Sequence, residues 1–243
     1  MQVMTGTSGF SYPAWRGSFY PEKLAVGKML AFYAGKLGTV EINNTFYRMP
    51  RPAVLERWAA DTPPTFRFAL KSPRSITHMR RLVGADAAVA QLADGVRAFG
   101  DRLGPILFQL PANLRKDVGV LEAFLSTLST LSTLSTLAAA PGKLRAAFEF
   151  RHESWLTDDV YAALRRHDAA LCVADSEELA TPLVATASWG YLRLRRQDYG
   201  KAALRRWAER LRKERFDQAF VFFKHETEGA GPALADSFRK MMM

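Results

Sequence analysis

The stretch TVEINNTFYR, residues 39–48, carries the pattern that decides the fold. Val40 and Ile42 alternate with Glu41 and Asn43, and successive side chains of a strand point to opposite faces. The segment therefore predicts a strand with one apolar face and one polar face. The apolar face must pack against helices, so the polar face is expected to point into a shared interior.

The same short, mostly apolar shape recurs along the chain, bounded by polar or turn residues. Helical patterns separate most of these segments, and only the gap at 177–190 lacks one. Alternating strands and helices predict parallel strands with right-handed crossovers. We therefore predict one domain over residues 1–243, an α/β fold that forms a single (β/α)8 TIM-like barrel of parallel strands with its site at the C-terminal face. The eight predicted strands are 2–8, 39–45, 66–72, 105–111, 146–152, 170–176, 191–196 and 219–225.

One segment breaks the pattern between the fourth and fifth predicted strands. STLSTLSTLSTL, residues 126–137, is a tandem tripeptide. A leucine at every third position drifts by about 60° per repeat around an α-helix, so it does not keep one buried face for long. We interpret it as a repeat expansion that lengthens a helix or loop on the outer or N-terminal side of the barrel.

Composition indicates a soluble globular protein, with 48% hydrophobic and 24% charged residues. There is no apolar run long enough for a membrane span, and the first ten residues lack the pattern of a signal peptide. Cys172 is the only cysteine, which favours a reducing compartment, and we expect a cytoplasmic protein without membrane contact.

The net charge of +10 suits nucleic acid, anionic surfaces or small anionic ligands. Much of it lies in one predicted helix at 201–216, where it is typical of a solvated helix face.

Nearly every predicted strand has a polar side chain on the face opposite its apolar residues, and we expect these groups to converge inside one end of the barrel. The first strand offers Thr5 and Thr7, and the sixth offers Asp175 opposite Cys172 and Ala174. Charged groups buried together must pair or face a wet cavity. Two interpretations follow, a ligand site or a self-satisfied ion-pair network such as Glu149 with Arg193 and Asp175 with Lys71. The predicted catalytic residues are Glu41, Lys71, Glu149 and Asp175, and the predicted ligand-binding residues are Thr7, Tyr12, Trp15, Asn43, Tyr47, His78, Gln109, Arg151, His152, Trp155, Arg193 and Lys224.

Glu41 and Glu149 suggest acid/base chemistry, because neighbouring carboxylates in different environments can split their pKa values. Aromatic residues follow several of the strands, including Tyr12 and Trp15 after the first, Tyr47 after the second and Trp155 after the fifth. Such rings either stack on a sugar or base or cap the barrel as an apolar lid.

A metal site is a further alternative. His78, His152 and His225 follow strand ends and, with Glu41, Glu149 and Asp175, resemble the ligand set of a manganese or zinc site. The nearby cations Lys71, Arg151, Arg193 and Lys224 would repel a metal ion, so we predict no metal and no cofactor. Gly229 and Gly231 precede a predicted helix whose N-terminus is a candidate phosphate site.

Six blocks in order along the chain resemble the signatures of the YecE-like family of uncharacterised proteins (domain of unknown function 72). They are GTSGFSYPAWRGSFYP, TVEINNTFYRMP, FRFALKSPRSITH, LGPILFQLP, FEFRHESW and VADSEE. The resemblance covers nearly the whole chain and implies a TIM-barrel-like fold, but no established activity. One departure is RLRR at 193–196, where family members often read Arg-x-His-Gly, so a histidine role there does not carry over.

Together these features predict a pocket for a small, polar, anionic ligand such as a sugar phosphate, with carboxylate acid/base chemistry. Nucleic-acid binding or processing through the basic surface is the second hypothesis, and a non-catalytic ligand-binding protein is the third. The sequence contains no nucleotide-binding loop, HExxH motif or GxSxG motif that would favour a specific reaction.

Overall fold

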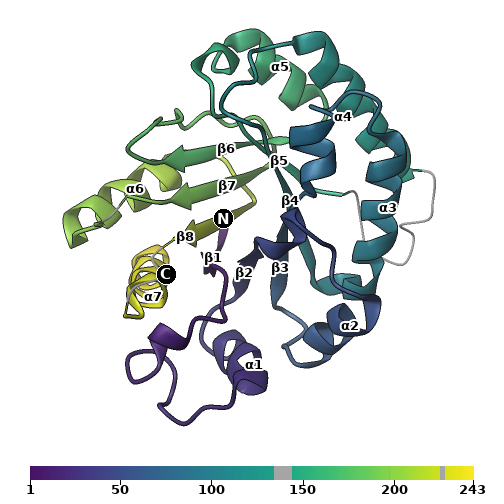
Figure 1. Ribbon diagram of the computed structural model, residues 1–243. Helices are drawn as coiled ribbons and strands as arrows, with labels where there is room; N and C mark the ends of the chain where they lie inside the picture. Colours follow the sequence, from purple (N-terminus) through teal and green to yellow (C-terminus); the bar gives the residue numbers. More distant parts are fainter. Residues whose placement is uncertain (134–143, 197, 225–227) are drawn as a thin grey trace.

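A computed structural model describes residues 1–133, 144–196, 198–224 and 228–243. Eight parallel strands close into a barrel in chain order, with β1 hydrogen-bonded to both β2 and β8. This arrangement confirms the predicted (β/α)8 TIM-like barrel, and Figure 1 shows the helices lying outside the strands. The strands are β1 (Gln2–Ser8), β2 (Thr39–Ile42), β3 (Arg67–Lys71), β4 (Leu103–Gln109), β5 (Ala146–Glu149), β6 (Ala170–Asp175), β7 (Trp189–Leu194) and β8 (Gln218–Phe223).

Helices follow most strands, as the periodicity predicts. Pro52 begins a helix, where its missing N–H costs nothing, and residues 176–188 join β6 to β7 without a helix. The α-helices are α1 (Met29–Ala34), α2 (Pro52–Ala60), α3 (Asp86–Val96), α4 (Val118–Thr133), α5 (Asp158–Arg166), α6 (Lys201–Lys213) and α7 (Ala230–Met242).

The main apolar core lies between the barrel and its helices. Val40 and Ile42 of β2 and Phe148 of β5 belong to it, together with apolar residues from the helices. In α6 the stripe that includes Leu204 and Leu211 is buried, while most of the basic residues of the helix are exposed. The predicted alternation of faces therefore holds for these strands.

A second, smaller core fills the barrel interior. Small side chains such as Ala69, Ala147 and Ala170 lie with large ones such as Tyr191 and Phe222, and all five are almost fully buried. Mixing small and large residues lets inward-pointing side chains fill a narrow barrel. The inward polar groups lie beyond this second core, toward the C-terminal ends of the strands.

In two strands, β1 and β6, the polar side chains point in the opposite direction from the one predicted. Thr7 faces outward, where its hydroxyl and backbone N–H both contact the Tyr33 hydroxyl of α1. Asp175 also faces outward and accepts hydrogen bonds from Tyr199 and from Trp207 of α6. The expected inward directions of Thr5, Thr7 and Asp175 are wrong, and Met4 and Cys172 fill the interior at these strands instead.

The cause in β6 is that both of its faces are apolar. Leu171 and Val173 pack on the helices while Ala170 and Cys172 pack inside, so alternation alone does not identify the inner face. In β1 the residues that face inward are Met4 and Ser8. Gly6 lies between them and lets the backbones of β1 and β2 approach closely, because a Cβ at this position would lie 1.9 Å from the carbonyl oxygen of Thr39.

The first part of the Ser-Thr-Leu repeat extends α4, which agrees with the interpretation of a lengthened helix. Leu128 of the repeat is buried, and Thr127 donates to Asp86 of α3 at 2.9 Å. Residues 134–137 of the repeat lie outside the described residues. In the described part of the chain, every helix is too short or too polar to cross a bilayer.

Candidate functional site

A single guanidinium joins the two carboxylates that the sequence singles out. Arg193 on β7 donates through Nη2 to Glu41 Oε1 at 2.8 Å and through Nη1 to Glu149 Oε2 at 2.5 Å. All three side chains are buried, with at most 3% of the side chain exposed. The predicted pair of Glu149 with Arg193 is therefore present, whereas Asp175 pairs with Arg196 rather than Lys71.

Each carboxylate has further partners that fix it in place. Glu41 Oε1 accepts from Ser8 Oγ at 2.8 Å and from Asn43 Nδ2 at 3.2 Å, and its Oε2 accepts from the Tyr191 hydroxyl at 2.7 Å. Glu149 Oε1 accepts from Gln109 Nε2 at 2.7 Å. Groups from five strands, or directly after them, thus meet in one hydrogen-bonded network, which we call the Arg193 network: Ser8, Glu41, Asn43, Gln109, Glu149, Tyr191 and Arg193.

Both carboxylates of this network are held in the ionised form. Burial by itself would raise the pKa of Glu41 and Glu149, but the charge of Arg193 and the hydrogen bonds outweigh it and lower both values. The same ion pairs raise the pKa of Arg193 despite its burial. Neither carboxyl pKa is raised, as a general acid near neutral pH would require, because one cation stabilises both ionised forms.

Above the Arg193 network lies a pocket of about 250 Å³ at the C-terminal mouth of the barrel. Its floor and walls are strongly cationic, since the carboxylates of the network lie beneath the lining. Eight of the predicted site residues line it. The lining residues are Ser8, Tyr12, Asn43, Phe46, Tyr47, Lys71, Gln109, Arg151, Arg193, Arg195 and Lys224.

Lys71, the last residue of β3, is partly buried in this pocket. Its ammonium lies 4.2 Å from the centre of the Phe46 ring, within the range of a cation–π contact. Among the described residues Lys71 forms no ion pair, because Glu41 and Glu149 are both engaged by Arg193. Burial, followed by the charge of Arg193, lowers the pKa of Lys71 to about 8.

The other cations of the pocket differ in how far they are neutralised. Arg151 pairs with the exposed Glu178 at 2.8 Å, and Arg195 lies 3.7 Å from Glu149. Lys224 is exposed and has no ion pair with any described residue. The Nε atoms of Arg193 and Arg195 are buried and have no hydrogen-bond partner among the described residues. Buried donors of this kind normally find an acceptor, so each leaves an unmet hydrogen bond near the pocket.

Several predicted site residues do not line the pocket and instead stabilise its surroundings. Trp15 is 1% exposed and packs within the aromatic cluster after β1, which matches a lid rather than a stacking platform. Trp155 is buried, stacks on Phe150 and donates from Nε1 to the carbonyl of Leu114, so its expected place in the pocket wall is wrong. Tyr12, by contrast, does line the pocket.

The two described histidines that were predicted as site residues also lie outside the lining. His152 accepts from the backbone N–H of Ser154 and caps the turn η6 (Glu153–Trp155). His78 packs against Phe46, and burial with the nearby charge of Lys71 lowers its pKa. In the described ranges no group of three or more His, Cys, Asp or Glu side chains is placed to hold a metal ion, and His225 lies outside them.

The predicted phosphate site at the start of α7 does not reach the pocket. Gly229 is the N-cap of α7 and lies against Ser18, and neither Gly229 nor Gly231 is among the lining residues. The sequence reasoning missed Ser8 and Tyr191. Tyr191 lies two residues before Arg193 and so shares its inward face, which was a usable signal, whereas Ser8 depended on the inner face of β1.

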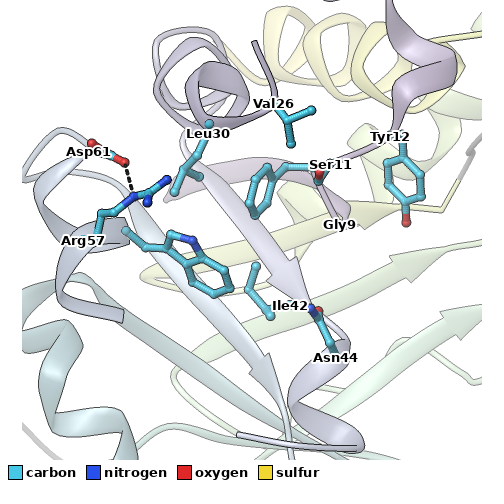
Figure 2. Close-up of a pocket in the computed structure, with 12 residues that line it drawn as sticks. Gly9, Ser11, Tyr12, Val26, Leu30, Ile42, Asn44, Arg57 and Asp61 are labelled. Atoms are coloured by element: carbon cyan, nitrogen blue, oxygen red, sulfur yellow. Dashed lines mark ion pairs between the residues drawn. The ribbon is translucent and has the colours of Figure 1, made fainter. Parts of the chain in front are cut away.

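A second pocket of about 440 Å³ lies beside the first, between the β1–α1 loop, α1 and α2 (Figure 2). Its walls mix apolar and polar residues, with Phe10 and Trp58 in edge-to-face contact, and the ion pair of Arg57 with Asp61 lies at its edge. Tyr12 is among the lining residues of both pockets.

Comparison with known proteins places these features in a family. The family described as "Protein of unknown function DUF72" matches residues 4–243. A crystal structure of a DUF72 family protein from Thermotoga maritima is 26% identical, with a TM-score of 0.82, and the alignment covers 100% of this chain and 99% of that one.

Two curated bacterial relatives match part of the chain. The UPF0759 protein YecE of Escherichia coli (strain K12) is 29% identical over 151 residues, which are 62% of this chain and 48% of that protein. The UPF0759 protein YunF of Bacillus subtilis (strain 168) is 26% identical over 154 residues, 59% of this chain and 50% of that protein. The alignments thus span about half the length of these curated relatives.

Proposed function

The chain belongs to the DUF72 family, whose description assigns no activity, and we propose that it binds a small anionic ligand in the cationic pocket and transforms it there. The ligand carries a phosphate or carboxylate group on a polar, sugar-sized body. The pocket of about 250 Å³ suits a compact molecule of this kind.

The observation that carries the proposal is the charge balance of the pocket. Five cationic side chains line it, namely Lys71, Arg151, Arg193, Arg195 and Lys224, and no carboxylate of the described residues does. Packing like charges together is costly unless an anion compensates them. Structural needs account for Arg193, which pairs with Glu41 and Glu149, and in part for Arg195, which lies 3.7 Å from Glu149. They do not account for Lys71 and Lys224, which form no ion pair with any described residue.

The roles of the residues follow from their surroundings. Arg195, Lys224 and Arg151 supply a charge clamp for the anionic group, and guanidinium groups match the oxygen atoms of phosphate and carboxylate well. Glu41 and Glu149 keep Arg193 in place and act through it, as buried and ionised groups. Lys71 is the group that exchanges a proton near neutral pH, because its pKa is lowered to about 8.

Calorimetric titration with sulfate, phosphate, sugar phosphates and the matching neutral sugars tests the proposal. Anions should bind and raise the melting temperature, whereas neutral sugars should not. The Arg195→Gln variant should weaken sulfate binding by about tenfold, as expected for the loss of one charge-assisted contact. Arg57→Gln, in the second pocket, is the matched control and should bind sulfate normally. Equal binding of neutral sugars and sugar phosphates would contradict the proposal.

The other two hypotheses give different results in the same experiments. Nucleic-acid binding through the basic surface predicts retention of oligonucleotides with a steep salt dependence, and this retention should survive Arg195→Gln. A non-catalytic ligand-binding protein predicts tight binding of a metabolite without turnover by the wild-type chain. The cytoplasmic location stays a prediction, with the single Cys172 as its support.

A further inference from the structure

Lys71 differs from the other cations of the pocket in position and surroundings. It ends β3 on the inward face that it shares with Ala69, so its side chain rises from the barrel interior into the pocket. Lys224, the other lysine of the lining, is exposed at the rim. A ligand whose anionic group is held by the rim cations would therefore reach Lys71 with its opposite end.

The charged groups that face Lys71 favour its neutral amine. Arg193 and Arg195 of β7 and its continuation repel the ammonium, while Glu149 and Glu41 attract it. Glu149 and Glu41 are hydrogen-bonded to Arg193, at 2.5 and 2.8 Å respectively, and neither forms an ion pair with Lys71. A lysine that is desolvated and next to another cation is the arrangement that makes its amine a nucleophile.

We propose that the Lys71 amine forms an imine with a carbonyl group of the anionic ligand, which defines the ligand as a small oxo acid or an aldehyde or ketone that bears a phosphate. This inference rests on the proposed anion-binding function. It adds the reactive group of the ligand and a covalent step to that function.

The step is balanced without a further reactant. The neutral amine attacks the carbonyl carbon, a C–N bond forms, and the carbonyl oxygen leaves as water with the two amine hydrogens. A proton taken from solvent gives the iminium ion, which draws electrons from the adjacent carbon atom. With a pKa of about 8, roughly one tenth of Lys71 is free amine at neutral pH, against well below one hundredth for an ordinary lysine.

The environment of the iminium ion is suited to this step. The Phe46 ring, whose centre lies 4.2 Å from Nζ, offers a face to a positive charge while excluding water from one side. The Tyr12 and Tyr47 side chains complete the lining on the side of the β1 and β2 loops. Water has less access to a bond formed at this depth than to one formed at the exposed Lys224.

Reductive trapping on the intact protein tests the inference. Pyridoxal 5′-phosphate, glyoxylate or pyruvate is added with cyanoborohydride, and the adducts are located by peptide mass mapping. We expect one dominant adduct on Lys71, formed at least about tenfold faster than on Lys224, with a rate that rises through about pH 8. Lys71→Arg should abolish this adduct, and Arg57→Gln, outside the cationic pocket, should leave it in place. Labelling of lysines in proportion to their exposure, with Lys71 unlabelled, would overturn the inference.

The same experiment separates this inference from the proposed function. Sulfate should protect Lys71 from pyridoxal 5′-phosphate, and pyridoxal without its phosphate should label Lys71 more slowly. If pyridoxal and pyridoxal 5′-phosphate label Lys71 equally fast and sulfate does not protect it, the imine proposal is supported and the anion-binding proposal is refuted. If sulfate binds and none of the carbonyl compounds labels Lys71, the anion-binding proposal is supported and the imine proposal is refuted.

Discussion

The Arg193 guanidinium on β7 lies 2.5 Å from the Glu149 carboxylate on β5, inside the barrel, and both side chains are at most 3% exposed. The second amino group of the same guanidinium binds Glu41 on β2. One buried cation is thus shared by two carboxylates that are far apart in the sequence. Its position determines which groups above it are left to face a ligand.

Replacing Arg193 should destabilise the fold strongly. The Arg193→Met variant leaves Glu41 and Glu149 buried without their shared cation, and the free energy of unfolding should fall by about 3–5 kcal/mol. Arg151→Met is the matched control, because its ion pair with Glu178 is largely exposed and should contribute no more than about 1 kcal/mol. Urea unfolding of both variants at neutral pH measures the difference, and equal losses would contradict the assignment.

Acid should weaken the protein through the same network. The folded-state pKa values of Glu41 and Glu149 lie below the ordinary 4.5, so their stabilisation is complete above that pH and is lost as the pH falls through the folded values. The free energy of unfolding should therefore drop below about pH 4.5. Glu149→Gln should be less stable at neutral pH and should show a shallower drop in acid. An unchanged acid slope in this variant would refute the contribution of Glu149.

Lys71 should make the stability of the protein rise with pH in the alkaline range. Its folded-state pKa of about 8 lies below the ordinary 10.5, so the unfolded chain binds more protons between these values and stability contributed by this group rises with pH. Sulfate stays doubly charged over this range, so its affinity should fall as Lys71 loses its charge near pH 8. In Lys71→Met the sulfate affinity should be weaker at neutral pH and nearly constant from about pH 7 to 9, as calorimetry can check.

Asp175 should matter for stability and not for the pocket. Its carboxylate accepts from Tyr199 at 2.8 Å and from Trp207 at 3.1 Å, outside the barrel. Asp175→Asn should reduce the free energy of unfolding by about 1.5–3 kcal/mol, the range for hydrogen bonds to a charged group. It should change the fluorescence of Trp207 and leave sulfate affinity as it is. If Asp175→Asn lost sulfate affinity while keeping the stability of the wild-type protein, Asp175 would belong to the ligand site.

The part of the site that could be predicted from the sequence is the part with a clear contrast between strand faces. In β2, β5 and β7 one face is apolar and the other carries Glu41, Glu149 or Arg193, and all three groups point inward as expected. In β6 both faces are apolar along most of the strand, so Asp175 at its end could not be oriented by alternation.

Aromatic and histidine residues after the strands were harder to place. A loop residue has no fixed period, and a ring near the mouth of a barrel can line a pocket or pack beneath it. Tyr12 and Tyr47 line the cationic pocket, whereas Trp15 and Trp155 are 1% exposed in apolar clusters. Burial of a large apolar ring stabilises the fold, and nothing in the local sequence distinguishes the two outcomes.

The barrel could be derived from the sequence alone, because eight alternations of strand and helix admit few other arrangements. The apolar contrast along β2, β5 and β7 likewise identified which of their polar groups face inward. That Glu41 and Glu149 share Arg193 became evident only from the folded barrel. Alternation sets the face on which a side chain lies, but which groups from distant strands meet depends on how the ring closes. The lowered pKa values of Glu41, Glu149 and Lys71 follow from these contacts between distant strands.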